Sequence, residues 1–123
     1  MLYLISKLYF YLLKFREWGY AMNILRKTSF NTPVISIGNI SVGGTGKTPM
    51  IIYISQLLTK QNITHVIVSR GYKKNKKGTI IVQDYNRKII LDPFVAGDEP
   101  IMLTYKLKNI PIVVDEDKKR AIT

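Results

Sequence analysis

The residues best suited to chemistry in this sequence form a glycine-rich stretch that ends in Gly46-Lys47-Thr48. Small residues let consecutive backbone N–H groups converge on an anion, a lysine reaches the outer phosphates of a nucleotide, and a hydroxyl can bind Mg²⁺. Pro49 suits the first turn of a helix, whose N-terminal dipole also attracts phosphate. The spacing therefore predicts a site for a nucleoside triphosphate with Mg²⁺, in which Thr48 is the metal ligand. The predicted loop comprises Ser41, Val42, Gly43, Gly44, Thr45, Gly46, Lys47 and Thr48.

The match to the usual phosphate-loop spacing is incomplete, because Ser41 stands where that spacing has glycine. An ordinary glycine-rich turn between a strand and a helix is the alternative interpretation. A dinucleotide-binding loop fits less well, since no G-x-G-x-x-G pattern can be laid over these glycines.

The elements that must position this loop follow an α/β pattern. β-Branched runs predict strands, and apolar residues at helical spacing predict a helix that begins at Thr48 and packs on the sheet. Together they predict a P-loop-like parallel sheet with flanking helices, incomplete for a doubly wound domain. The expected strands are 34–37, 65–69 and 111–114, the expected hairpin 79–82 with 88–91, the expected second helix 97–107, and the expected sheet-facing residues Ile51, Ile54, Leu57 and Leu58.

Basic residues follow the second expected strand, 65–69. Arg70 leaves the second strand at its carboxyl end, where ligands bind in open α/β sheets. Four lysines come directly after it and form either a solvated flexible loop or a clamp on a phosphorylated or membrane-bound substrate. These lysines are Lys73, Lys74, Lys76 and Lys77.

Carboxylates precede or open the later helical segments. Asp98 and Glu99 either cap a helix or place a carboxylate near the γ-phosphate as a base or metal ligand. For Asp115 and Asp117 capping is the expected role. The lone His65 has no acid close in sequence and is interpreted as structural.

Composition limits the classes of function. A chain of 123 residues fits one domain, and the absence of cysteine excludes disulfides and thiolate metal sites. The formal net charge is +11, and residues 91–123 hold six of the eight acidic residues. The basic remainder indicates anionic partners such as nucleotide, lipid headgroups or nucleic acid. Because the chain is short for an α/β nucleotide-binding domain, we expect a truncated product, a split gene or part of a longer protein.

Residues 1–27 form a separate predicted region, an N-terminal helix ahead of the 33–123 domain. Ser6, Lys7, Lys14 and Glu17 share one side of the helical wheel and leave a broad aliphatic and aromatic face. The apolar run is short for a membrane span and lacks a secretory cleavage site. The pattern predicts a helix that lies in the cytoplasmic leaflet of a membrane. A core-packing helix of a soluble domain is the alternative.

Four segments in this order resemble one family, the tetraacyldisaccharide 4′-kinases, which are the lipid A 4′-kinases of Gram-negative bacteria. The resemblance covers nearly the whole chain, and Ser41 fits it because the family has Ser or Thr there. The segments are PVISIGNISVGGTGKTP at 33–49, VSRGY at 68–72, GDEP at 97–100 and PIVVDEDKKRA at 111–121.

The resemblance implies a P-loop kinase at the cytoplasmic face of the inner membrane. Such a kinase transfers the γ-phosphate of ATP, with Mg²⁺, to the 4′-hydroxyl of an acylated glucosamine disaccharide 1-phosphate. By resemblance, Lys47 contacts the β- and γ-phosphates, Thr48 binds Mg²⁺, Asp98 is the catalytic aspartate and Arg70 contacts substrate or phosphate. The partners implied are that lipid substrate and the membrane surface, with no nucleic acid.

The resemblance also implies that machinery is missing. Family members are much longer, and their Asp-Asp-Gly motif and catalytic histidine lie beyond the last residue of this sequence. We therefore expect weak or no kinase activity from this chain alone, with a second polypeptide as the source of the remaining half. The alternatives are a non-catalytic nucleotide-binding or membrane-associated remnant and a basic nucleic-acid-binding module.

Overall fold

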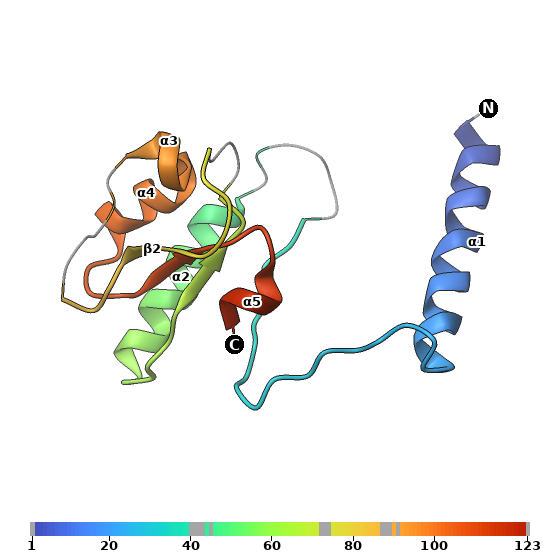
Figure 1. Cartoon of the computed structure of the whole chain (residues 1–123), viewed down its shortest axis with the longest axis horizontal. Coiled ribbons are helices and arrows are strands. Elements are labelled where there is room, and N and C mark those ends of the chain that lie inside the picture. The colour runs from blue at the N-terminus through green and yellow to red at the C-terminus, as the bar shows by residue number, and fades with distance from the viewer. Residues whose placement is uncertain are drawn as a thin grey trace. The chain divides into compact units, whose positions relative to one another are not determined.

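The computed structural model describes residues 2–39, 44, 46–71, 75–86, 90 and 92–122. The chain divides into two compact units, Met1–Thr32 and Pro33–Thr123, each drawn in Figure 1. Some residues of interest fall outside the described ranges. From the predicted phosphate loop these are Ser41, Val42, Gly43 and Thr45, and from the segment after Arg70 they are Tyr72, Lys73 and Lys74.

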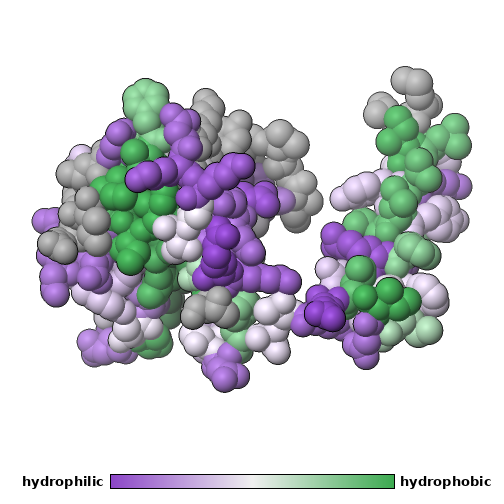
Figure 2. All heavy atoms as spheres, viewed as in Figure 1, coloured by the Kyte–Doolittle hydropathy of each residue, from purple (hydrophilic) through white to green (hydrophobic). Residues whose placement is uncertain are grey.

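The first unit is built on one long helix, α1 (Leu2–Ala21). Asn23, with φ of 57°, ends the helix, and the Leu25 N–H donates to the Gly19 carbonyl at 3.0 Å. Figure 2 shows apolar side chains exposed along α1. Trp18 is also exposed, and its ring centroid is 5.9 Å from that of Phe15. In the part of the chain that the structure describes, no helix has the length and apolarity needed to cross a bilayer.

The second unit is centred on a three-stranded sheet made of β1 (Ile67–Ser69), β2 (Ile80–Gln83) and β3 (Ile112–Val114). Its strand order is β1-β3-β2, and β3 runs parallel to β1 and antiparallel to β2. The sheet is therefore mixed, and the prediction of a parallel sheet is wrong for β2. The antiparallel pairing brings the start of β2 to the edge where β1 and β3 end.

In the described ranges of this unit, four helices accompany the sheet: α2 (Lys47–Lys60), α3 (Pro93–Ala96), α4 (Asp98–Lys106) and α5 (Lys118–Ile122). Figure 1 shows α3 and α4 side by side. α4 contacts α2 as well as β2 and β3, whereas α5 contacts β1. The core joins the sheet to α3 and α4 and consists of Ile80, Val82, Ala96, Ile101, Leu103, Leu107, Ile112 and Val114.

The structure corrects two expectations for the segments around the phosphate loop. Residues 34–37 were expected to form a buried strand, but 33–39 have no regular secondary structure and Val34 and Ile35 are 54% and 62% exposed. A β-branched run becomes a strand only where a neighbouring strand pairs with it. In α2 the residues that pack on the core are Ile51 and Ile52, whereas Leu57 is 43% exposed.

Other elements form close to where the sequence placed them. The expected helix at 97–107 and strand at 111–114 are α4 and β3, and β1 occupies the second half of the expected 65–69 strand. Of the expected second hairpin arm only Ile90 is described, and its N–H donates to the Val82 carbonyl at 3.1 Å.

His65 has the structural role that its isolation in the sequence indicated. Its Nε2 lies 2.6 Å from the hydroxyl of Ser55, a buried residue of α2, and its Nδ1 lies 2.9 Å from the Ile63 carbonyl oxygen. This pair ties the middle of α2 to the segment that enters β1. Figure 1 shows α2 and β1 running in opposite directions, so the start of α2 lies toward the carboxyl end of β1.

Candidate phosphate-binding site

Gly46 starts α2 with a backbone that favours glycine. Its φ and ψ are 78° and 18°, in the left-handed region, and no side chain caps the helix. The first N–H groups of a helix have no partner within it and point toward the space ahead of its N-terminus. Among the described residues, none lies within 4 Å of a Cβ added at Gly46. Lys47 is exposed at the same helix start. The described part of the predicted loop thus has the geometry of an anion site.

Thr48 joins this helix start to α4. Its hydroxyl donates to Glu99 Oε1 at 2.7 Å, and both side chains are partly buried. Glu99 belongs to the first turn of α4 while contacting the first turn of α2, so two positive helix ends favour its negative charge. The contact leaves the lone pairs of the Thr48 oxygen available to a cation.

Asp98 is the first residue of α4, exposed and adjacent to Glu99. The capping alternative for this pair is wrong, because Gly97 is the N-cap and no side chain bonds there. Gly97 has φ of 95°, which suits glycine. Asp98 therefore has no capping role in α4 and lies next to the residue that touches Thr48.

The sequence offered both carboxylates of GDEP as candidates near the γ-phosphate, and the resemblance gave a role only to Asp98. The structure gives the direct contact with the phosphate loop to Glu99. The signal was present in GDEP, where two consecutive carboxylates open one helix. Which of them reaches the phosphate loop depends on how α4 docks on α2, and this docking is visible only in the folded chain.

Arg70 lies exposed just after β1, at the carboxyl edge of the sheet. The chain there is held by two bonds of Ser69: its carbonyl accepts from the Asp115 N–H at 3.0 Å, and its hydroxyl accepts from the Gly71 N–H at 3.4 Å. Among the described residues, Thr48 and Glu99 are joined directly. No hydrogen bond or ion pair within that part of the chain joins Arg70 to either of them.

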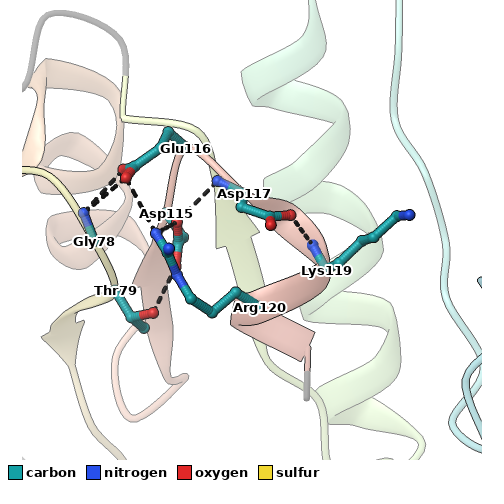
Figure 3. A network of polar contacts seen from close by, with 7 residues as sticks. All are labelled: Gly78, Thr79, Asp115, Glu116, Asp117, Lys119 and Arg120. Atoms are coloured by element: carbon teal, nitrogen blue, oxygen red, sulfur yellow. Dashed lines mark hydrogen bonds and ion pairs between the residues drawn. The ribbon is translucent and has the colours of Figure 1, made fainter.

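A polar network occupies the end of β3, as Figure 3 shows. Asp115 is fully buried and accepts from Arg120 Nη2 at 2.6 Å and Nε at 2.9 Å, and from the Thr79 hydroxyl. Arg120 Nη2 also donates to Glu116 Oε1 at 3.1 Å, and Glu116 accepts from the Gly78 N–H at 2.8 Å.

The charges in this network reinforce one another. Hydrogen bonding to Arg120 holds the pKa of the Asp115 carboxyl well below its usual range, and the bond to Thr79 acts in the same direction against the effect of burial. The hydrogen bond to Asp115 in turn raises the pKa of the Arg120 guanidinium. Both groups therefore stay ionised throughout the physiological range.

The two aspartates after β3 have different roles. Asp117 accepts from the Lys119 N–H at 3.0 Å at the start of α5, so the capping prediction is confirmed for it. Asp115 bonds the Asp117 N–H at 2.8 Å but is chiefly the buried partner of Arg120 and Thr79. Its role was missed because Thr79 lies far away in the sequence.

The described residues fit a magnesium–nucleotide complex in part. Thr48 offers a hydroxyl oxygen, Glu99 a nearby carboxylate and Lys47 a positive charge, which suit Mg²⁺ and phosphate. No group of three or more His, Cys, Asp or Glu side chains suited to a metal occurs within the described ranges. Mg²⁺ commonly takes its other ligands from water and the phosphates of its nucleotide, so a site with few protein ligands is typical of it.

Comparison with known proteins gives a consistent result. The family model described as Tetraacyldisaccharide-1-P 4'-kinase matches residues 1–123. A tetraacyldisaccharide 4'-kinase of Aquifex aeolicus is 40% identical over 114 residues, which cover 92% of this chain and 35% of that protein. One from Desulfotalea psychrophila is 37% identical over 97% of this chain and 34% of its own.

A solved structure has the same fold. A crystal structure of LpxK from Aquifex aeolicus in complex with ATP superposes with a TM-score of 0.79 and 38% identity, covering 94% of this chain and 36% of that one. The chain spans about a third of the length of the curated relatives it matches.

Proposed function

This chain belongs to the tetraacyldisaccharide-1-P 4'-kinase family, as its sequence motifs predicted, and we propose that it provides the ATP-binding part of a lipid kinase. The reaction proposed is phosphorylation of the 4′-hydroxyl of a tetraacyldisaccharide 1-phosphate, the acceptor that the family is named for. The observation that carries the proposal is the 2.7 Å contact from Thr48 to Glu99, because it brings the phosphate loop and the GDEP segment to one place.

Each described site residue has a role in this proposal. Lys47 neutralises charge on the β- and γ-phosphates, and Thr48 offers its oxygen to Mg²⁺ while its proton stays in the bond to Glu99. Asp98 accepts the proton of the attacking hydroxyl, and Arg70 holds a phosphate of donor or acceptor. Bound MgATP supplies the phosphoryl group. Phosphoryl transfer depends mostly on positioning and charge neutralisation, which suits a site of this kind.

The proposal includes a location and partners. An exposed aromatic helix followed by Arg26 and Lys27 suits the boundary of an anionic bilayer, so we place the protein at the cytoplasmic face of the inner membrane. The acylated acceptor would be met there. The chain spans about a third of the length of its relatives. Residues 1–123 alone would bind ATP with weak or no transfer, and a second polypeptide is one proposed source of the remaining machinery.

Nucleotide binding is tested with Lys47→Ala in the full chain. We expect the affinity for MgATP, measured by isothermal titration calorimetry, to fall at least about tenfold, because a charge-assisted contact to phosphate is worth about 1.5–3 kcal/mol. Lys60→Ala is the matched control, since Lys60 lies at the other end of α2. Equal affinity in the wild type and Lys47→Ala would show that the loop does not bind ATP in the proposed way.

Transfer is tested separately with radiolabelled ATP and the tetraacyldisaccharide 1-phosphate in detergent. The chain alone should give weak or no product, and a polypeptide carrying the rest of a family member should restore it. Rapid transfer by the chain alone would contradict the expected dependence on a second polypeptide. Unimpaired ATP binding without transfer in either case favours the non-catalytic alternative.

A further inference from the structure

The basic segment after β1 leaves and rejoins the sheet at a single acidic turn. We define the basic loop as the described residues 70–71 and 75–78. Just before it, the Ser69 carbonyl accepts from the Asp115 N–H at 3.0 Å. At its end, the Gly78 N–H donates to Glu116 Oε1 and Oε2 at 2.8 and 3.1 Å. The next residue, Thr79, donates its hydroxyl to Asp115.

A further bond holds the loop between these ends. The Asn75 N–H donates to the Phe94 carbonyl at 2.9 Å, and Phe94 belongs to α3, which precedes Gly97 and Asp98. Lys76 lies between Asn75 and Gly78. The described part of the loop is thus tied to the sheet edge and to the helix that leads into GDEP, which differs from the freely solvated loop considered from the sequence.

Arg120 completes the arrangement from α5. Its guanidinium bonds both oxygens of Asp115 and one of Glu116, so it fixes the two carboxylates that hold the loop. Figure 3 shows Arg120 directed at this pair and the Lys119 side chain directed away from it. Asp115 has no exposed surface and therefore cannot itself contact a ligand. The described basic residues of the loop, Arg70, Lys76 and Lys77, are exposed.

We propose that Asp115, Glu116 and Arg120 form a positioning clamp that holds the basic loop ready to bind a phosphate ester at the carboxyl edge of the sheet. The proposal rests on the proposed function and adds to it three residues that act through the loop backbone. The phosphate belongs either to ATP or to the 1-phosphate of the acceptor, and the chemistry recognised is the same.

The clamp acts on affinity because a loop already held in place loses less conformational freedom when a ligand binds. Ordering one flexible side chain on binding costs about as much as a twofold to tenfold change in affinity. Releasing Gly78 and Thr79 would free several residues together. We therefore expect loss of the clamp to weaken phosphate binding about tenfold.

Electrostatics alone predicts the opposite change in anion affinity when the clamp is lost. The sign of the measured change therefore distinguishes the two explanations. Glu116→Ala and Asp115→Asn each remove a negative charge beside the basic loop, so simple electrostatics predicts tighter anion binding. Positioning predicts weaker binding. The Glu116 side chain is 44% exposed, so Glu116→Ala should fold even if the buried Asp115→Asn does not. Asp84→Asn is the control, because it removes an exposed acid at the far end of β2.

The experiment measures binding of MgATP and, separately, of glucosamine 1-phosphate to the full chain by calorimetry. Circular dichroism first establishes that each variant is folded, so loss of affinity is not loss of folded protein. We expect Glu116→Ala to weaken at least one ligand about tenfold and Asp84→Asn to leave both within about twofold. A loss confined to ATP assigns the loop to the donor, and a loss confined to the sugar phosphate assigns it to the acceptor.

Arg120 provides a conservative rescue. Arg120→Met should weaken binding like Glu116→Ala, and Arg120→Lys should recover part of the loss, since a lysine keeps one charged contact. Unchanged or tighter binding of both ligands by folded Glu116→Ala and Arg120→Met overturns the clamp. Failure of the wild type to bind either ligand overturns the proposed function itself, a result distinct from any difference between variants.

Discussion

At the residue scale, the negative charge of the buried Asp115 carboxylate must be balanced by hydrogen-bond donors and a positive charge. Its two oxygens receive a guanidinium, a hydroxyl and a backbone N–H. Removing one partner of a buried pair leaves an uncompensated charge, which costs far more than an exposed pair contributes. Arg120, whose side chain is 51% exposed, therefore matters mainly through what it neutralises.

This pair predicts a pH-dependent effect of Arg120→Met. The pKa of Asp115 is lowered in the folded chain, so its contribution to stability is present above the unfolded pKa of about 4 and is lost as the pH falls below it. The wild type should exceed Arg120→Met in urea midpoint at pH 7, and the difference should shrink steadily below pH 4. A difference that grows as the pH falls would contradict this assignment. Lys60→Met is the control and should show no such trend.

At the element scale, backbone conformation explains the glycine at the start of α2 better than a lack of room for a side chain does. Gly46 has φ of 78°, and a methyl group there would meet none of the residues that the structure describes. The left-handed conformation costs an ordinary residue about 1–2 kcal/mol. Gly46→Ala should therefore lower the free energy of unfolding by about that amount. Gly38→Ala also adds a methyl group in open space, and Gly38 is not among the glycines with positive φ, so it should change stability by less than about 0.5 kcal/mol. Urea unfolding followed by circular dichroism measures both, and equal losses would refute the conformational argument.

Local signals explain which elements were predictable. Gly46 with Pro49, and Gly97 with Pro100, mark helix starts that the structure confirms in α2 and α4. The run 34–37 has strong β-branched character, but strand formation depends on a partner that composition does not specify. The contacts of Thr48 with Glu99 and of Thr79 with Asp115 likewise join segments far apart in the sequence. Residue types at the site could therefore be predicted, whereas their pairing required the fold.

At the scale of the whole molecule, the two units have different surface chemistry. The Pro33–Thr123 unit has its own core, whereas the Met1–Thr32 unit keeps large apolar side chains of α1 exposed. Contiguous exposed apolar surface of this kind indicates an interaction site. Aromatic rings with neighbouring cations, such as Lys7 4.8 Å from the Tyr3 ring, suit the boundary between lipid headgroups and acyl chains.

Membrane binding can be followed through Trp18, the single tryptophan in the chain. It is 51% exposed, so its fluorescence should shift to shorter wavelength when α1 enters vesicles containing anionic phosphatidylglycerol. Deleting residues 2–32 should abolish cosedimentation with these vesicles and leave MgATP affinity within about twofold, because each unit packs separately and surface changes away from a site are usually small. Cosedimentation without a Trp18 shift, or retained after the deletion, would place the membrane contact in Pro33–Thr123. Since that unit carries the basic loop, its attachment would then weaken steeply with added salt, whereas apolar insertion of α1 would not.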